Sequence, residues 1–252
     1  MKIINVLAGL VLGFAVSMST AWSAENDVNA ESKESEKVDV KAGAQSENKA
    51  SSSGAEDFVY KPPMRGAPAA RIGGGTRGIG DVALELVVLA PDHTGLTTKE
   101  QPTLYWYVSE AVPSKLEVTL INDENIDPEL EEVVATPGSA GIQSIDLAKT
   151  GAKLESGLEY RWFVSVIADP GQRSNDIVAS GTIQRISPGS ELKARIAGAD
   201  ERSLVRVYAE EGVWYDAIDT LSRLIEKSPD DAALLQQRAA LLEQVGLQAA
   251  AN

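Results

Sequence analysis

The most informative stretch of the chain is Leu154-Glu-Ser-Gly157-Leu-Glu-Tyr160-Arg-Trp162-Phe-Val164. Gly157 indicates a turn, and the residues from Tyr160 onward alternate in hydropathy as they do in a β-strand. A Tyr that enters a strand directly after a turn is typical of a tyrosine corner, in which the Tyr hydroxyl bonds to the backbone a few residues upstream. The stretch therefore predicts a β-sandwich around it.

Other alternating runs lie on both sides of this stretch, at the short spacing that a sandwich requires. They cover residues 82–88, 103–108, 116–120, 132–136, 142–147 and 177–186. In the run 103–108, a period of two sends Trp106 inward and Tyr105 and Tyr107 outward, so we expect Trp106 and Trp162 to meet in the core. With the tyrosine corner, the runs predict an immunoglobulin- or fibronectin-like sandwich over residues 81–187.

A helical period replaces the strand pattern after Pro188-Gly189 and continues through residues 188–252. Two helical segments are split at Gly212, and Pro229-Asp-Asp231 ends the second and caps a third that runs from about residue 232 to 245. One tetratricopeptide-like unit fits Leu204, Tyr208, Gly212, Trp214, Ala217, Leu221 and Pro229. A plain helical hairpin is the alternative.

The predicted fold class is therefore mainly β with an α-helical tail. It consists of the immunoglobulin/fibronectin-like sandwich, followed by a tetratricopeptide-like helical hairpin and one further helix. Because a single repeat does not stand alone, we expect the tail helices to pack against the sandwich or a partner.

The N-terminal part predicts export. Residues 1–23 have the form of a signal peptide, with Lys2, an apolar run over 3–16 and small residues for cleavage near Ala21 to Ala24. An uncleaved anchor is the alternative. Residues 24–57 predict a disordered acidic linker, and residues 58–80 an extended segment rich in Gly, Pro and Arg. We expect a periplasmic or secreted protein with no stable membrane span after cleavage.

Composition narrows the function classes. The 252 residues carry a net charge of -14 and no Cys. The acidic balance argues against nucleic acid as a partner, because proteins that contact the phosphate backbone concentrate Lys and Arg. The lack of Cys excludes disulfides, thiolate metal sites and cysteine nucleophiles.

Two segments are candidates for binding a partner. The first is the basic Gly-rich stretch that contains Arg65, Arg71, Gly73, Gly74, Gly75 and Arg77. Its glycines could cradle an anion, but no Lys-Ser/Thr and no helix follow as in a phosphate loop, so an acidic protein partner is the better hypothesis. The second is the loop after the tyrosine-corner strand, with Asp169, Arg173 and Asp176, where Arg173 has the alternative role of pairing with a neighbouring carboxylate.

The sequence predicts no catalytic, cofactor or metal site. His93 is the only histidine, and no nucleophile elbow accompanies it, so we expect a solvated loop residue. Residues 123–129 place oxygen ligands at alternate positions as a calcium loop does. Pro128 and Val134 occupy the positions where such a loop needs Gly and Glu, which favours an acidic solvated hairpin.

The order of these parts resembles a bacterial family known as domain of unknown function 928. The segments that carry the resemblance are Arg65–Pro68, Arg71–Gly78, the strand ending in Pro91, Gly95–Thr97, Gln101–Thr103, Pro137-Gly138, Gly141-Ile142, Tyr160–Trp162, Asp169-Pro170, Arg173-Ser174 and Tyr208–Ala217. The resemblance implies an exported sandwich-plus-helices protein and supplies no catalytic residues. The acidic segment after Leu120 is longer than the short hairpin that the family implies.

Together these observations predict an exported, non-enzymatic interaction protein whose partner is another exported or envelope protein. An envelope or surface module that binds glycans is the alternative, since Tyr105 and Tyr107 could stack on sugars. A hydrolase built on Asp and Glu is a weaker alternative, because no two carboxylates stand at a recognisable spacing. The oligomeric state is left open.

Overall fold

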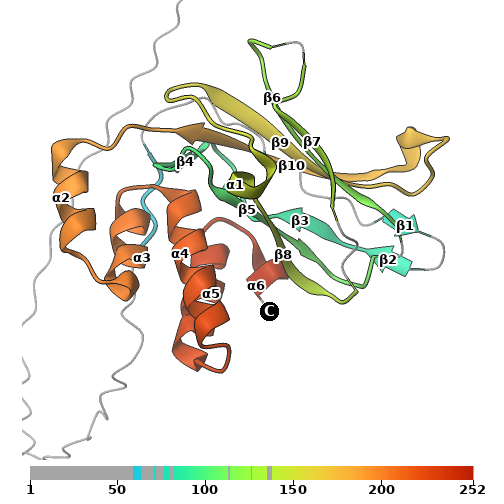
Figure 1. Cartoon of the computed structure of the whole chain (residues 1–252). Helices are drawn as coiled ribbons and strands as arrows, with labels where there is room; N and C mark the ends of the chain where they lie inside the picture. Colours follow the sequence, from blue (N-terminus) through green and yellow to red (C-terminus); the bar gives the residue numbers. More distant parts are fainter. Residues whose placement is uncertain are drawn as a thin grey trace, which may run out of the picture. The chain divides into compact units, whose positions relative to one another are not determined.

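A computed structural model describes residues 59–63, 71, 77–79, 82–112, 114–125, 127–134 and 138–251. The chain divides into two compact units, Met1–Ala50 and Ser51–Asn252, and every described residue belongs to the second. The predicted signal peptide and acidic linker lie outside the described residues. Figure 1 shows the arrangement of the elements in the second unit.

Two main sheets form the β part of this unit. The larger sheet has five strands in the order β4 (Gly95–Thr97), β10 (Ile177–Arg185), β9 (Glu159–Val166), β6 (Leu116–Asn122) and β7 (Leu130–Val134). The smaller has the order β3 (Leu86–Val88), β5 (Thr103–Val108) and β8 (Gly141–Asp146). A short ribbon pairs β1 (Arg77–Ile79) with β2 (Val82–Leu84). All pairs are antiparallel except that of β4 with β10, which makes the larger sheet mixed.

The helices follow largely in one C-terminal block. They are α1 (Leu147–Thr150), α2 (Ser190–Gly198), α3 (Glu201–Glu210), α4 (Trp214–Lys227), α5 (Ala232–Glu243) and α6 (Gln248–Ala251), with a 3-10 turn η1 at Arg173–Asn175. The carboxylate of Asp231 caps α5, as predicted, by accepting hydrogen bonds from Ala233 N at 3.0 Å and Leu234 N at 3.3 Å. Among the described residues, no helix is both long enough and apolar enough to cross a membrane.

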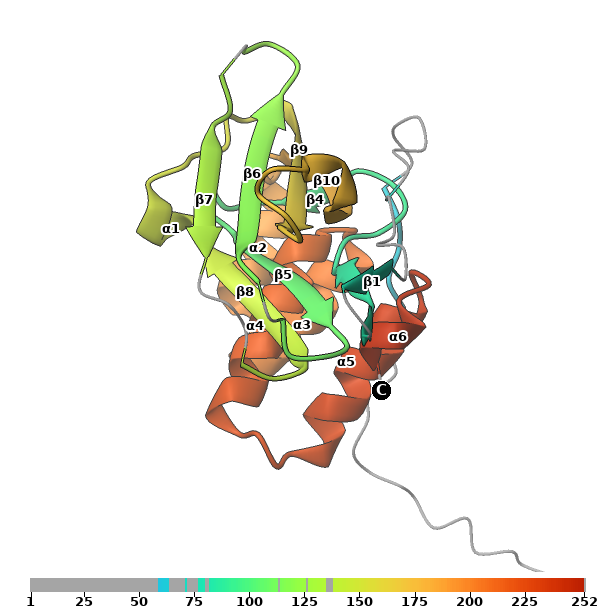
Figure 2. The ribbon, with the colours of Figure 1, turned by 90° about the vertical axis from the view of Figure 1, so that its right-hand side faces the viewer.

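The predicted fold class, a mainly β sandwich with a tetratricopeptide-like helical tail, is wrong. Helices and strands take comparable shares of the described residues, and the fold is α/β. The expectation that the helices pack against the strands is confirmed, because α4 contacts β4 and β5 and its residues belong to the same hydrophobic core as both sheets. The helices are therefore an integral part of the fold and not a separate tail. Trp214 and Tyr215 at the start of α4 are both fully buried. Figures 1 and 2 show α4 lying against the strands, with α3 and α5 beside it.

The tyrosine corner itself is confirmed. The Tyr160 hydroxyl accepts a hydrogen bond from the Glu155 backbone N–H at 3.0 Å, and the Tyr160 side chain is buried. Gly157 turns the chain with φ of 87°, in the left-handed region that favours glycine. This local feature therefore formed as the sequence predicts, although the fold around it is of another class.

The expected outward orientation of Tyr105 requires a correction. Trp106 and Trp162 are both buried as predicted, but Tyr105 is only 4% exposed. Its hydroxyl donates to Asp219 on α4 at 2.9 Å. Because α4 covers this side of β5, a strand that was expected to face solvent on one side is buried on both.

Candidate functional site

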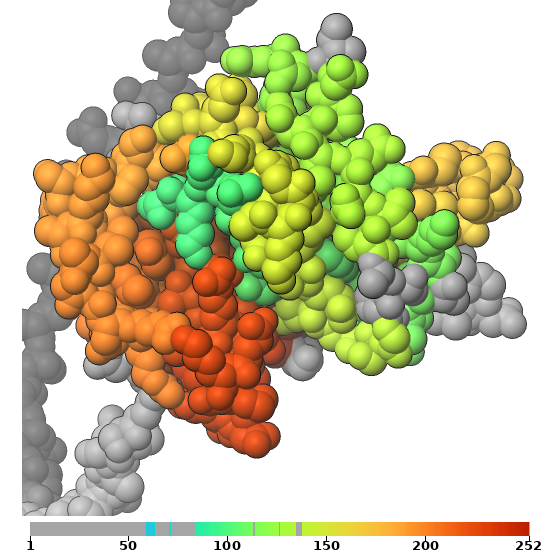
Figure 3. All heavy atoms as spheres, in the orientation of Figure 1, coloured from blue at the N-terminus to red at the C-terminus, as the bar shows by residue number. Residues whose placement is uncertain are grey.

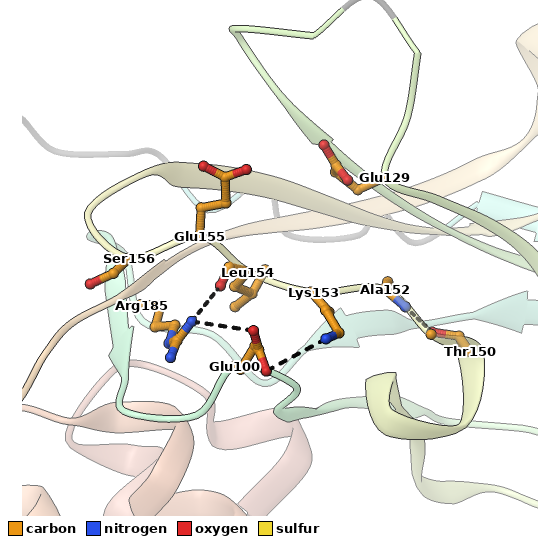
Figure 4. A pocket seen from close by; sticks show the side chains of 10 residues that line it. Glu100, Glu129, Thr150, Ala152, Lys153, Leu154, Glu155, Ser156 and Arg185 are labelled. Atoms are coloured by element: carbon orange, nitrogen blue, oxygen red, sulfur yellow. Dashed lines mark hydrogen bonds and ion pairs between the residues drawn. The ribbon is translucent and has the colours of Figure 1, made fainter.

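A polar cleft of about 830 Å³ opens on the surface beside the tyrosine corner. Ten residues line it: Glu100, Glu129, Thr150, Gly151, Ala152, Lys153, Leu154, Glu155, Ser156 and Arg185. Figure 4 shows the segment 150–156 along the floor of the cleft and Glu129 across its opening. In the space-filling view this yellow-green segment lies beside the green hairpin of β6 and β7 (Figure 3). Segments far apart in the sequence therefore build one recess.

The floor of the cleft is an extended segment between two turns. Gly151 ends α1 with φ of 87°, and Gly157 turns the chain into β9. Between them Leu154 is buried, and its N–H donates to the Glu100 carbonyl at 2.8 Å. Lys153 and Glu155 alternate with it and are exposed. The segment is thus held on one side and presents charged side chains on the other.

Loose ion pairs cross the cleft. Glu100 lies 3.7 Å from Arg185 Nη1 and 3.9 Å from Lys153 Nζ. Arg185 also donates to the Leu154 carbonyl at 3.0 Å, which anchors its guanidinium. The Lys153 side chain is 62% exposed, so its attraction to Glu100 is weakened by solvent. Replacing an exposed ion pair of this kind by an ion pair with another molecule costs little free energy.

The opposite rim is set by the acidic hairpin between β6 and β7. Glu129 accepts hydrogen bonds from the side-chain amides of Asn122 at 3.0 Å and Asn125 at 2.7 Å. The Asn122 side-chain oxygen in turn accepts from the backbone N–H groups of Glu124 and Asn125, which closes the turn. Two of the residues considered as ligands of a calcium loop, Asn125 and Glu129, therefore bond within the hairpin. Among the described residues, no group of three or more Asp, Glu or His is placed to hold a metal.

The lining residues decide what the cleft can do chemically. They supply carboxylates, one ammonium, one guanidinium, hydroxyls and backbone groups, and no aromatic or histidine side chain. These groups can form hydrogen bonds and ion pairs, as the groups at the polar rim of a protein interface do.

A second polar cluster is buried between α4 and the sheets. Asp216, fully buried, accepts from Thr97 Oγ1 at 2.6 Å and from Thr98 N at 3.0 Å, and also from the Thr98 hydroxyl. Burial raises the pKa of the Asp216 carboxyl, while the hydrogen bonds from Thr97 and Thr98 and the charge of Lys99 act in the opposite direction. The cluster ties the first turn of α4 to the chain just after β4.

Asp219 repeats this arrangement one turn along α4. Its Oδ1 accepts from the Tyr105 hydroxyl at 2.9 Å and from Arg223 Nε at 3.1 Å, and its Oδ2 pairs with Lys99. Burial, and then the Asp219 charge, raise the pKa of Tyr105. Both carboxylates are thus fully engaged in joining helix to sheet. They form a structural contact that leaves no oxygen free for a substrate.

The first predicted binding segment falls largely outside the described residues. Arg65 and Gly73–Gly75 lie there, and only the backbone of Arg77 is described, in β1. The Arg71 guanidinium donates to the carbonyls of Ala90 at 2.9 Å, Val245 at 3.1 Å and Gly246 at 3.2 Å. Arg71 therefore joins the end of the β3 segment to the turn after α5. A role for this segment in binding a partner stays a prediction.

The second predicted group lies in the loop between β9 and β10. Arg173 Nε donates to Asp176 at 2.5 Å, and its Nη2 donates to Glu117 on β6 at 2.8 Å. These hydrogen bonds to Glu117 and Asp176 raise the pKa of the Arg173 guanidinium. Asp169 accepts from Gly171 N at 2.8 Å. Arg173 thus pairs with neighbouring carboxylates, as the alternative had it, and none of the three residues lines the cleft. A role for these residues in binding a partner stays a prediction.

His93 is not the solvated loop residue that was expected. Its Nε2 lies 2.9 Å from the Tyr60 hydroxyl, and the two rings stack with centroids 5.8 Å apart. Tyr60 also packs edge-on against Trp214 at 5.1 Å. The Tyr60 backbone N–H donates to Gln244 at 2.7 Å. His93 therefore helps to hold the segment 59–63 on the helices.

Comparison with known proteins gives a family. The model of the family described as Domain of Unknown Function (DUF928) matches residues 72–252. No curated protein matches the chain. A multi-domain immunophilin from Arabidopsis thaliana is a similar solved structure, at 9% identity over 73% of this chain and 96% of that one. Its TM-score of 0.15 is too low to support any inference about fold or function.

Proposed function

The chain belongs to the DUF928 family, and from that premise we propose that it is an exported, non-enzymatic interaction module that recognises another exported or envelope protein. The cleft floored by residues 150–156 is its recognition surface. The family description supplies no activity, so the proposal depends on this chain's own surface.

The observation that carries the proposal is the contrast in how charged groups are used. The buried carboxylates of Asp216 and Asp219 have all their oxygens in hydrogen bonds. In the cleft, Lys153 has only a loose pair at 3.9 Å, and its neighbour Glu155 is exposed. Charged side chains presented on a rigid extended segment are suited to contact a second protein.

The glycan alternative loses its support. It required Tyr105 and Tyr107 to form an exposed stacking platform, but Tyr105 is buried under α4 and Tyr107 is half-buried. Sugar binding in the cleft would lack an aromatic face, because no lining residue is aromatic.

Crosslinked capture from the native envelope tests the proposal. The mature protein would be compared with the double charge reversal Lys153→Glu/Glu155→Lys, which preserves net charge and alters only exposed groups. The matched control is Glu191→Lys/Lys193→Glu, a pair of exposed residues on α2. We expect one partner that the native and control proteins retain and the cleft variant loses. Equal capture by all three would remove the cleft from the proposal.

A further inference from the structure

Strand β7 is one edge of the five-stranded sheet. Its neighbour in the sheet is β6, and it has no second strand partner among the described residues. Figure 2 shows β7 at the border of the sheet, with β6 on one side only. An edge strand presents unpaired backbone groups, which are a ready-made template for adding a strand from another chain.

The hydrogen-bond register shows which backbone groups of β7 face outward. Ile167 N donates to the Lys115 carbonyl at 2.9 Å, so the odd-numbered residues of β6 bond to β9. The even-numbered residues of β6 therefore face β7, where Leu120 pairs with Leu130 and Val118 with Glu132. The odd-numbered residues of β7, Glu131 and Val133, consequently direct their N–H and C=O groups to the open side.

Three of the five side chains of β7 are exposed as well. Val133 is 54% exposed, and Glu131 and Glu132 are also exposed. None of the described cations forms an ion pair with either glutamate. The exposed Val133 offers a small apolar contact next to two carboxylates that have no cation partner among the described residues.

The chain segment around β7 is acidic, and a described cation in contact with it is Arg173, which pairs with Glu117 on β6 across from Val133. Between Lys115 and Lys149 the chain has eight Asp and Glu residues and no Lys or Arg. This stretch holds β6, β7 and β8, with Glu129 of the cleft rim directly before β7. Edge-to-edge pairing of two copies through β7 would set these carboxylates against each other, which disfavours a second copy as occupant.

We propose that the open edge of β7 binds an extended, Lys/Arg-rich segment of the partner, which continues the five-stranded sheet by one strand. This inference rests on the proposed function and specifies the chemistry of the partner. Backbone bonds to Glu131 and Val133 supply the affinity, and basic side chains opposite Glu131 and Glu132 supply the selectivity. The cleft next to Glu129 receives the residues that follow.

Binding of synthetic peptides to the intact protein tests the edge. The probe, called the Lys/Val peptide, is a fluorescent peptide that repeats Lys-Lys-Val-Val, so that Lys reaches both faces of the sheet. The control, called the Glu/Val peptide, has Glu in place of each Lys. Val133→Pro removes the outward N–H without touching a bond to β6, and Val133→Ala is its matched control. We expect the Lys/Val peptide to bind, the Glu/Val peptide not to bind, and Val133→Pro to weaken binding about ten-fold or more relative to Val133→Ala. Equal affinity of the two variants would overturn edge pairing.

Two further measurements keep the test decisive if Val133→Pro does not fold. Hydrogen exchange should show new protection of the Glu131 and Val133 amides on peptide binding, and peptide binding without that protection contradicts the proposal. Glu131→Lys/Glu132→Lys should also abolish binding of the Lys/Val peptide. A dimer in solution whose formation protects the same two amides would make a second copy the occupant and overturn the basic partner.

The same variants separate this inference from the proposed function. The two β7 variants are Val133→Pro and Glu131→Lys/Glu132→Lys. If they retain the native partner and Lys153→Glu/Glu155→Lys loses it, the cleft stays the recognition surface and edge pairing is overturned. If the β7 variants lose the native partner and the cleft variant retains it, edge pairing is supported and the cleft is no longer the proposed recognition surface.

Discussion

The contact of α4 with the sheets and the side of the molecule around β7 use polar residues in opposite ways. At α4, Asp216 and Asp219 are buried, and every carboxylate oxygen accepts a hydrogen bond. Around β7, Glu131 and Glu132 are exposed and form no ion pair with the described cations. A buried carboxylate without partners would cost several kcal/mol, so the first region must be satisfied internally.

Residues of this chain that bind another molecule are expected among the charges that the fold does not use. Charges that are completely paired hold the fold together, and they have no capacity left for another molecule. Charges that remain in water contribute little to stability, which allows them to be arranged for a partner. Substitutions in the contact of α4 with the sheets should therefore change stability, and substitutions of the exposed charges should change binding.

Removing the helices should have the largest effect. A chain truncated at Pro188 loses Trp214 and Tyr215, which are fully buried against the sheets. We expect this chain to lose cooperative unfolding, because the loss exceeds the whole stability of a typical domain, about 5–15 kcal/mol. Near-ultraviolet circular dichroism and a thermal melt measure it. A cooperative melt of residues 58–187 alone would show that the sheets and helices are separable after all.

Within the helix–sheet contact, Trp214 is the largest single anchor. It is fully buried, packs edge-on against Tyr60 and donates from its indole N–H to the Leu89 carbonyl at 2.8 Å. Trp214→Ala should cost about 3–5 kcal/mol through the cavity it leaves. Urea denaturation measures this cost, with Leu235→Ala on the exposed side of α5 as the control, for which we expect no more than about 0.5 kcal/mol.

The local features of this fold were accessible from sequence, and its class was not. Alternation placed β5, β6, β9 and β10 closely, and the turn before Tyr160 identified the tyrosine corner. The run 82–88, predicted as one strand, is divided between β2 and β3 in different sheets. The helices and their packing on the strands were expected, but it was not foreseen that they cover the Tyr105 face of β5, because a period of two cannot show that a second layer covers the outward face.

The cleft could not be predicted because long-range contacts build it. Glu100, Lys153 and Arg185 meet only after β4, β9 and β10 have paired, and no local pattern links them. The same holds for Asp219 and Lys99, which lie in different parts of the chain. The pairing of Arg173 with Asp176 was predictable because the two residues are close in sequence. That closeness does not indicate whether they bind a partner.

Asp216 provides the next test of the buried region. Both of its oxygens accept hydrogen bonds from Thr97 and Thr98. Asp216→Asn replaces one accepting oxygen by an NH2 group, which then faces a hydrogen-bond donor of Thr97 or Thr98. The free energy of unfolding should fall by about 1–3 kcal/mol at neutral pH. Chemical denaturation measures the cost, with Asp230→Asn in the exposed turn before α5 as the control.

The pH dependence of that difference has a defined sign. Burial raises the pKa of Asp216 above 3.8, so the unfolded chain releases the proton at lower pH than the folded protein does. The native protein should therefore lose stability relative to Asp216→Asn as the pH rises from about 4 through the raised pKa. If the native protein instead becomes more stable relative to Asp216→Asn as the pH rises over this range, the hydrogen bonds outweigh burial in setting the pKa of Asp216.

Tyr160 tests the boundary between the two regions, since it is buried under the floor of the cleft. Tyr160→Phe removes the acceptor of the Glu155 N–H bond, and we expect a loss of about 1–2 kcal/mol in unfolding free energy. Tyr107→Phe, at a half-buried tyrosine of β5, is the control. A loss no larger than that of the control would mean that the corner bond contributes nothing to the fold.

The smallest effect on stability is expected in the cleft itself. Lys153→Gln/Glu155→Gln removes two exposed charges, and neither change leaves a buried group unpaired. Unfolding free energy should stay within about 0.5 kcal/mol of the native value, because surface substitutions away from caps and cores rarely exceed this. The same variant should capture less of the partner, and the loss should shrink at high salt as screening weakens the native interaction. A variant that is destabilised as much as Asp216→Asn would place the cleft with the structural contacts and erase the division between the two regions.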